Sequence, residues 1–226
     1  MLLNKLFRKF YTQAFNPVLR RRVENMICGP YPRVFDRKKI IFIHIPKTAG
    51  KSVEKAIGVR GSVHLLYRED EAIIGDRISN YDCFSVVRNP YTRLVSAYAY
   101  LIRGGNNSVA DIRLADTFIR PAGSLGGFVK KSLACLSGQG VRIFRPQTDF
   151  LTAINGEIAD IDILHFENLD ADFHVVATRL GIDPVLKKTN KSFKSGLKLS
   201  LSDDALEIVY QIYARDFRFL GYDRRN

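Results

Sequence analysis

A short loop rich in lysine, hydroxyl and glycine residues is the part of this chain best suited to chemistry. It spans residues 46–52 and follows an apolar, β-branched run at 40–45, which has the length of a strand. An amphipathic stretch with helical spacing comes next. The first turn of such a helix has backbone N–H groups without internal partners and is positive through the helix dipole. With the mobile charge of Lys47, the segment is expected to bind the phosphate or sulfate group of a nucleotide-type donor.

The loop shares only the end of the motif that binds nucleoside triphosphates. Gly50, Lys51 and Ser52 match that end, whereas Ile45 stands where the leading glycine is expected. Ile45 and the proline after it cannot form the same wide glycine-rich turn, and Lys47 enters the loop early. No apolar strand of the sequence ends in an aspartate that would position Mg²⁺. A P-loop kinase or NTPase that uses the glycine, lysine and serine is kept as an alternative.

A second group of polar residues stands at a later strand-to-helix junction. Arg88 follows the apolar run 83–87, at the carboxyl edge where open α/β sheets bind ligands. Asn89 is a good N-cap, and Pro90 suits the first helical position. Ser96, two turns along, would place a hydroxyl beside a phosphate held by Arg88. Taken alone, this segment is equally compatible with a plain strand-to-helix junction.

The alternation of apolar runs and amphipathic stretches predicts the elements that must position these residues. Strands are expected at 40–45, 83–87 and 161–166, and helices at 50–58, 69–78, 90–102, 109–136 (two or three stretches), 169–180 and 202–217. This order favours an α/β class, a P-loop-like three-layer fold with a central, mainly parallel sheet flanked by helices. Residues 39–226 are predicted to form a single domain. Residues 1–38 form a basic leader, which would be either a membrane-surface helix or a helix docked on its own domain.

Composition narrows the classes of protein and partner. The 226 residues fit one α/β domain, and the formal net charge of +12 favours an anionic partner. The three cysteines are odd in number and without Cys-x-x-Cys spacing, which argues against a disulfide framework or zinc site and for a reducing compartment. No run approaches the ~20 apolar residues of a membrane span, and no signal peptide is evident. The chain is therefore expected to be soluble and cytoplasmic.

Five segments in order carry a resemblance to a known family. The first two are "HIPKTAGKS" and "RNPYTRLVSAY". They are followed by "RPQTDFL", "HFENLDADFHVVATRLGI" and "YARDFRFLGY". Over residues 39–222 the chain resembles the Golgi-type carbohydrate sulfotransferases, in particular the branch that contains the uronosyl 2-O-sulfotransferases and their bacterial relatives.

The resemblance implies a donor, 3′-phosphoadenosine 5′-phosphosulfate. No metal is expected, because a sulfuryl group carries less negative charge than a phosphoryl group and needs no bridging cation. Lys47 would contact the bridging oxygen, and Arg88 and Ser96 would hold the 3′-phosphate. A basic loop with Lys191 and Lys194 would close over the donor, although a solvated charged loop is an equal reading. The backbone amides around the 5′-phosphosulfate would come from Thr48, Ala49, Gly50, Lys51 and Ser52. Position 51 departs from the family, so Lys51 either adds a donor contact or points to solvent.

The resemblance also implies a catalytic base. His64, in "SVHLLYRED", falls on the histidine that removes the hydroxyl proton in this branch, and a histidine suits that role near neutral pH. His44 and His165 are expected within strands, and His174 on a helix. Arg145 and Gln147 would line the acceptor side or form a structural turn.

The expected reaction is in-line transfer of a sulfuryl group to a hydroxyl of a carbohydrate or glycolipid. Lys47 and the helix-start amides would stabilise charge on the leaving oxygen. The partners expected are that acceptor and, through the basic leader, the surface of a membrane, with no nucleic acid. The lack of an anchor points to a bacterial cytoplasmic enzyme. Besides the kinase or NTPase, a non-catalytic basic module that binds anionic polymer or membrane remains an alternative.

Overall fold

A three-stranded parallel sheet lies at one end of the molecule. The computed structural model describes residues 38–59, 64–186 and 201–224. Within them the strands are ordered β1 (Ile40–Ile43), β2 (Asp82–Val87) and β3 (Asp162–His165). Ile40 pairs with Asp82, and Phe84 pairs with Asp162. All of β1 and the last five residues of β2 are buried, as expected for parallel strands covered on both faces.

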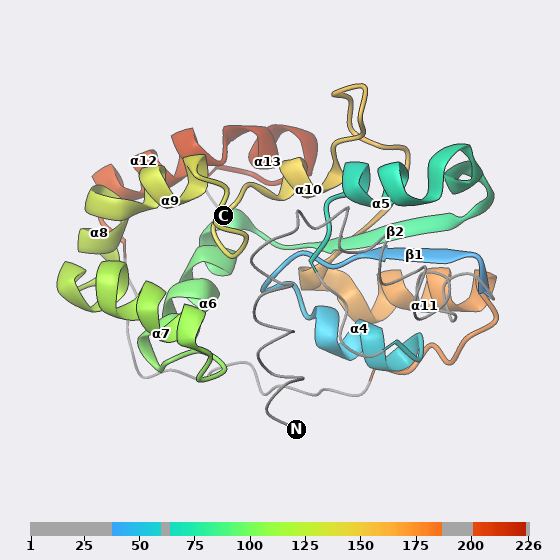
Figure 1. Ribbon diagram of the computed structural model, residues 1–226, viewed down its shortest axis with the longest axis horizontal. Helices are drawn as coiled ribbons and strands as arrows, with labels where there is room; N and C mark the ends of the chain where they lie inside the picture. The colour runs from blue at the N-terminus through green and yellow to red at the C-terminus, as the bar shows by residue number, and fades with distance from the viewer. Residues whose placement is uncertain (1–37, 60–63, 187–200, 225–226) are drawn as a thin grey trace, which may run out of the picture.

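Helices flank this sheet. α5 (Tyr67–Ile74) lies above the strands in Figure 1, and α4 (Gly50–Ala56) and α11 (Leu169–Arg179) lie below them. Each parallel connection crosses through at least one helix, because consecutive parallel strands cannot be joined by a tight turn. The predicted α/β fold with a parallel sheet between helices is therefore confirmed.

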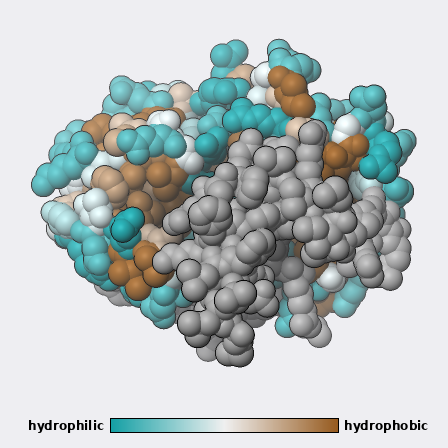
Figure 2. All heavy atoms as spheres, in the orientation of Figure 1, coloured by the Kyte–Doolittle hydropathy of each residue, from teal (hydrophilic) through white to brown (hydrophobic). Residues whose placement is uncertain are grey.

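A helical half stands beside the sheet (Figure 1). It contains α6 (Pro90–Ile102), α7 (Val109–Leu114), α8 (Leu125–Phe128), α9 (Ala134–Gly138) and α12 (Asp203–Ile212), with π-helical turns at Ala115–Ile119 and Val129–Leu133. The short helices α10 (Gln147–Leu151) and α13 (Ala214–Phe219) lie between the halves. Figure 2 shows apolar side chains gathered on the surface of this half.

Each half has its own hydrophobic core. The sheet half packs β1 and β2 against α4, α5 and α11, with Phe84 and Phe173 fully buried. The helical half packs α6 against the π-helical turns and α12 around Leu101, Phe128 and Phe144. The loop that follows β1 and the start of α6 lie where the two cores meet, so residues of the expected site are held by both.

A buried arginine ties the halves together at this junction. Arg93, on α6, is 2% exposed, and its Nε donates to the Pro46 carbonyl at 3.0 Å. One of its terminal nitrogens donates to the Arg145 carbonyl at 3.0 Å, and the other to the Ile143 carbonyl at 3.5 Å. A buried guanidinium is costly unless its donors are satisfied. These carbonyls therefore fix the loop after β1 and the segment before α10 against α6.

The elements depart from the predicted bounds where side chains and glycines impose their own geometry. β1 ends at Ile43, two residues earlier than expected. The helix predicted at 69–78 stops at Ile74 and continues as a 3₁₀ turn, because Gly75 adopts a positive φ of 69°. The helix predicted at 202–217 breaks at Tyr213, whose buried hydroxyl donates to the Phe144 carbonyl at 2.8 Å.

Two predicted features lie outside the described residues: the basic leader, except for Lys38, and the basic loop that carries Lys191 and Lys194. Among the helices that the structure describes, none combines the length and apolar character needed to cross a membrane.

Candidate active site

The loop between β1 and α4 has an unusual backbone. Lys47 and Ala49 both adopt left-handed conformations, with φ of 75° and 67°. Such conformations cost free energy for residues other than glycine, and they curl successive N–H groups toward one side, as in anion-binding nests. Ala49 is the N-cap of α4 and has no side-chain cap, so no side chain of its own competes for the amides of the first turn.

Two of the hydroxyl residues in this loop are partly committed to the protein. The Thr48 hydroxyl is buried and donates to the Ile45 carbonyl at 2.9 Å. The Ser52 amide donates to the Ala49 carbonyl at 2.9 Å. Of the backbone amides expected around the donor, that of Ser52 is therefore engaged within the loop, whereas the Thr48 contact involves its hydroxyl and not its amide.

Gly50 is required by packing against His44. The buried His44 ring lies so close that a Cβ on Gly50 would be 2.0 Å from its Nε2 atom. The ring cannot move away freely, because its Nδ1 is 2.6 Å from a Glu54 carboxylate oxygen on α4. The absence of a side chain at position 50 thus lets the loop close over the end of β1.

Lys47 projects from the loop onto an aromatic ring. Its Nζ lies 4.2 Å from the centre of the Tyr100 ring, which comes from α6. Burial and the positive charges of Arg88, Arg103 and Lys51 together lower the pKa of Lys47 to about 8, whereas the charge of Asp111 acts to raise it. The Lys51 side chain is exposed to solvent, so its effect on Lys47 is one of charge.

Arg88 connects the second motif to the loop. Its guanidinium stacks 4.1 Å above the centre of the Phe166 ring and donates from Nε to the Thr92 hydroxyl at 3.0 Å. A terminal nitrogen lies 3.4 Å from the Lys47 carbonyl. Burial lowers the pKa of Arg88, and the nearby Glu167 raises it. The two motifs predicted from sequence are therefore brought into direct contact.

The start of α6 has the predicted capping geometry. The Asn89 side chain accepts hydrogen bonds from the Tyr91 and Thr92 amides, and Pro90 occupies the first turn. Ser96 lies further along the same helix and is half-buried. This cap holds the chain direction at Arg88, from which the guanidinium projects.

Arg145 and Gln147, expected on the acceptor side or in a turn, both bind backbone groups of the protein. The Gln147 side chain is fully buried, and its amide exchanges two hydrogen bonds with the Arg88 backbone, at 2.9 and 2.7 Å. Arg145 donates from its guanidinium to the Gly140 carbonyl at 3.3 and 3.2 Å. An acceptor-binding role for Gln147 has no support in these contacts, because both ends of its amide are used to hold Arg88.

His64 is held with one ring nitrogen bonded and with its neutral form favoured. Its Nδ1 lies 2.8 Å from the His44 carbonyl, and since a carbonyl only accepts, Nδ1 carries the hydrogen. In the neutral ring the Nε2 atom then has the lone pair. The ring centres of the two histidines are 4.2 Å apart. Burial and the neighbouring His44 lower the pKa of His64 to about 4.

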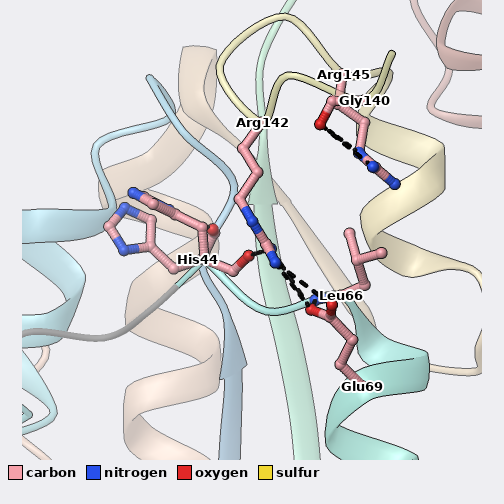
Figure 3. Close-up of polar contacts among 7 residues, drawn as sticks. His44, Leu66, Glu69, Gly140, Arg142 and Arg145 are labelled. Carbon is pink, nitrogen blue, oxygen red and sulfur yellow. Dashed lines mark hydrogen bonds and ion pairs between the residues drawn. The ribbon is translucent and has the colours of Figure 1, made fainter. Parts of the chain in front are cut away.

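An arginine that sequence reasoning missed, Arg142, contacts the backbone of His64. Figure 3 shows its side chain reaching toward Glu69. Arg142 donates from one terminal nitrogen to the His64 carbonyl. Its other terminal nitrogen lies 3.3 Å from both carboxylate oxygens of Glu69, on α5. Glu69 in turn accepts a hydrogen bond from the Leu66 amide at 2.9 Å. The only sequence signal for these contacts was Glu69 itself, at the third position of a helix start.

The remaining histidines lie away from this cluster. The His165 Nε2 atom pairs with the Leu220 carbonyl at 3.0 Å, and His174 is exposed on α11. Among the described residues, no group of three or more histidine, cysteine or acidic residues is arranged to hold a metal ion.

Comparison with known proteins now gives the class. The model of the sulfotransferase family matches residues 32–223, and the chain belongs to that family. The protein is thus a sulfotransferase enzyme built on an α/β fold with a parallel sheet. Searches of curated proteins and of solved structures found no significant match.

Proposed function

We propose that the protein transfers a sulfuryl group from 3′-phosphoadenosine 5′-phosphosulfate to a hydroxyl of a carbohydrate or glycolipid acceptor. The observation that carries the proposal is the double contact of His44. Its carbonyl binds Nδ1 of His64, and its ring packs against Gly50 in the loop that carries Lys47. The neutral imidazole of His64 and the anion-binding loop that carries Lys47 therefore both contact His44. This places a base for the acceptor next to a site for the donor.

The proposed chemistry is one in-line displacement. The acceptor oxygen forms a bond to sulfur as the bond from sulfur to the bridging oxygen breaks, and the acceptor proton passes to Nε2 of His64. Lys47 and the backbone amides of the loop stabilise the negative charge that grows on the leaving oxygen. The product nucleotide is adenosine 3′,5′-bisphosphate.

The residues that bind the rest of the donor are proposed from their positions in the family motifs. Arg88 and Ser96 hold the 3′-phosphate, and the contact of Arg88 with the Lys47 carbonyl couples the two ends of the donor site. A guanidinium suits this role because it remains charged and offers several donors in a fixed plane. Lys191 and Lys194 close over the donor in this proposal.

The acceptor class in this proposal follows from the resemblance to the carbohydrate branch, whereas the location and the membrane contact rest on the sequence pattern, including the basic, amphipathic residues 1–38. The enzyme acts in the bacterial cytoplasm on a carbohydrate or glycolipid, with residues 39–226 as one domain and the basic leader in contact with the membrane surface. The net charge of +12 supports an anionic donor and an anionic surface nearby.

Calorimetric titration of the full chain tests the donor. Adenosine 3′,5′-bisphosphate is expected to bind, whereas ATP with Mg²⁺ is expected to bind far more weakly. Lys47→Ala should lose affinity for the bisphosphate, while Lys55→Ala, at an exposed lysine on the helix α4 that follows the loop, should keep it. Tighter binding of ATP with Mg²⁺ than of the bisphosphate would overturn the donor assignment.

Transfer of label from ³⁵S-labelled donor tests the reaction. Glycans and glycolipids from bacteria are offered as a panel, and labelled product is expected from at least one hydroxyl acceptor. Binding of the bisphosphate with no transfer to any carbohydrate or glycolipid in the panel would count against this acceptor class.

A further inference from the structure

The Lys47 side chain packs on the ring of Tyr100, a residue that has no part in the proposed reaction. The Lys47 Nζ atom lies 4.2 Å from the centre of the Tyr100 ring, a distance at which a cation is attracted to the face of the ring. The two residues come from different halves of the molecule, since Lys47 follows β1 and Tyr100 is near the end of α6. The ammonium is therefore held by the helical half, and not by the loop that carries it.

The Tyr100 side chain is held in place by an aspartate on the next helix. The Tyr100 hydroxyl donates to Oδ2 of Asp111, on α7, at 2.8 Å. The same oxygen accepts the Asn106 amide at 3.0 Å. The Asp111 amide donates to the Ser108 hydroxyl, which caps α7, at 3.1 Å. Asp111 thus joins Tyr100 to the turn between α6 and α7.

The turn is shaped to leave room for this carboxylate. Gly105 adopts a φ of 61°, and a Cβ on it would lie 2.6 Å from Oδ2 of Asp111. A side chain at position 105 would therefore be strained and would also collide with the carboxylate. The glycine at position 105 is explained by this packing, which the proposed reaction does not require.

The charges that act on Lys47 make the position of Asp111 significant. Arg88, from the start of α6, Arg103, from its end, and Lys51, on α4, all disfavour the protonated amine, as does burial. Asp111 acts in the opposite direction. Among these described groups, it is the anion that offsets the surrounding positive charge.

We propose that Tyr100 and Asp111 are positioning residues that hold the Lys47 side chain in place and keep it protonated for the leaving oxygen. The inference rests on the proposed function, which makes Lys47 the group that meets that oxygen. Tyr100 restricts where the ammonium lies through its ring. Asp111 acts both through the Tyr100 hydroxyl and through its own charge.

The first test measures the titration of Lys47 without any donor. The full chain is labelled with trace acetic anhydride at a series of pH values, and the extent of labelling at Lys47 is read by mass spectrometry. Asp111→Asn is expected to move the midpoint to lower pH by roughly half a unit to one unit, because a nearby opposite charge is removed. Tyr100→Leu should move it in the same direction, and Tyr100→Phe, which keeps the ring, should move it less.

Asp116→Asn is the matched control, since Asp116 is an exposed aspartate paired with Arg120 in the next turn. It should leave the Lys47 midpoint unchanged. If Asp111→Asn and Tyr100→Leu both titrate like the wild type, the inference is wrong. A variant that fails to fold is recognised by circular dichroism, and Tyr100→Phe then carries the test, because it removes one oxygen atom only.

The second test follows the pH profile of sulfuryl transfer. Asp111→Asn should shift the alkaline fall in kcat/KM to lower pH, whereas loss of folded protein alone would scale the whole profile down without moving it. Absence of transfer by the wild type would count against the proposed function and would leave the labelling result standing. Transfer with an unmoved alkaline limb would count against the positioning role alone.

Discussion

Lys47 and His64 are both half-buried basic residues whose pKa is lowered by burial, and the protein holds them in opposite ways. Lys47 has a strained left-handed backbone, and the far end of its side chain rests on a ring from the helical half. His64 is held at its ring, where Nδ1 donates to the His44 carbonyl, and at its backbone, where its carbonyl accepts from Arg142. Lys47 is therefore positioned through its ammonium group, and His64 through a ring nitrogen and its backbone carbonyl.

The comparison teaches that one physical effect serves two roles. Burial disfavours charge, so it keeps the His64 ring neutral, with Nε2 unprotonated, near neutral pH. The same effect works against the charge of Lys47, which the leaving oxygen needs. Burial therefore favours the neutral imidazole that a general base requires, whereas a buried ammonium needs a ring and an anion such as Tyr100 and Asp111 to remain charged.

The largest expected effect comes from removing the base. His64→Ala should lower kcat by about 10²- to 10⁴-fold, because general base catalysis is lost. Its affinity for adenosine 3′,5′-bisphosphate, measured by calorimetry, should stay close to that of the wild type. His174→Ala, an exposed histidine on α11, is the control and should retain full turnover. Unchanged turnover in His64→Ala would remove this residue from the reaction.

Gly50→Ala should disturb the packing that joins the two groups. The added methyl would lie 2.0 Å from the His44 ring, which Glu54 holds in place. We expect a loss of about 1–3 kcal/mol in the free energy of unfolding, measured by urea denaturation, because overpacking forces neighbours to move. Binding of the bisphosphate should weaken as well. Gly126→Ala, where a Cβ meets no atom within 4 Å, should be neutral or stabilising.

The contact of Arg142 with His64 should contribute less, since the Arg142 side chain is 35% exposed. Arg142→Ala is expected to lower kcat by about tenfold, with little change in donor affinity, because His64 becomes less well placed. Glu69→Gln should have a smaller effect of the same kind, and the double variant should be less than additive, since the two residues act as a pair. Arg68→Ala, exposed on the same helix as Glu69, is the control. Additive effects would show that Glu69 and Arg142 act separately.

The pH profile of the wild type should report both groups at once. Activity needs a neutral His64 and a charged Lys47, so kcat/KM should fall as the pH drops through about 4 and as it rises through about 8. The ordinary pKa values of histidine and lysine are 6.5 and 10.5, so burial moves both the acid and the alkaline fall in activity to lower pH. An acid limb near 6.5 would mean that His64 titrates as an exposed imidazole.

Local signals predicted the elements and the order of the motifs. The β-branched run ending at Pro46 and the cap at Asn89 depend on residues close in the chain, and the structure confirms the strand and the cap. The breaks at Gly75 and Tyr213 were missed. The first depends on a backbone conformation, and the second on a hydroxyl that reaches the Phe144 carbonyl, 69 residues away.

The amino-acid sequence alone determined that a lysine-bearing loop follows a buried strand, and that an arginine follows another, because periodicity and capping are properties of neighbours. Tertiary structure decided which groups support them. Gln147, expected on the acceptor side or in a structural turn, holds the Arg88 backbone from 59 residues away, and Arg142 reaches His64 across 78 residues of chain. Contacts of this length form only when both cores pack, since the direction of a side chain is set by the packing of its whole element. The contact of Lys47 with Tyr100 likewise forms only when the two halves pack together.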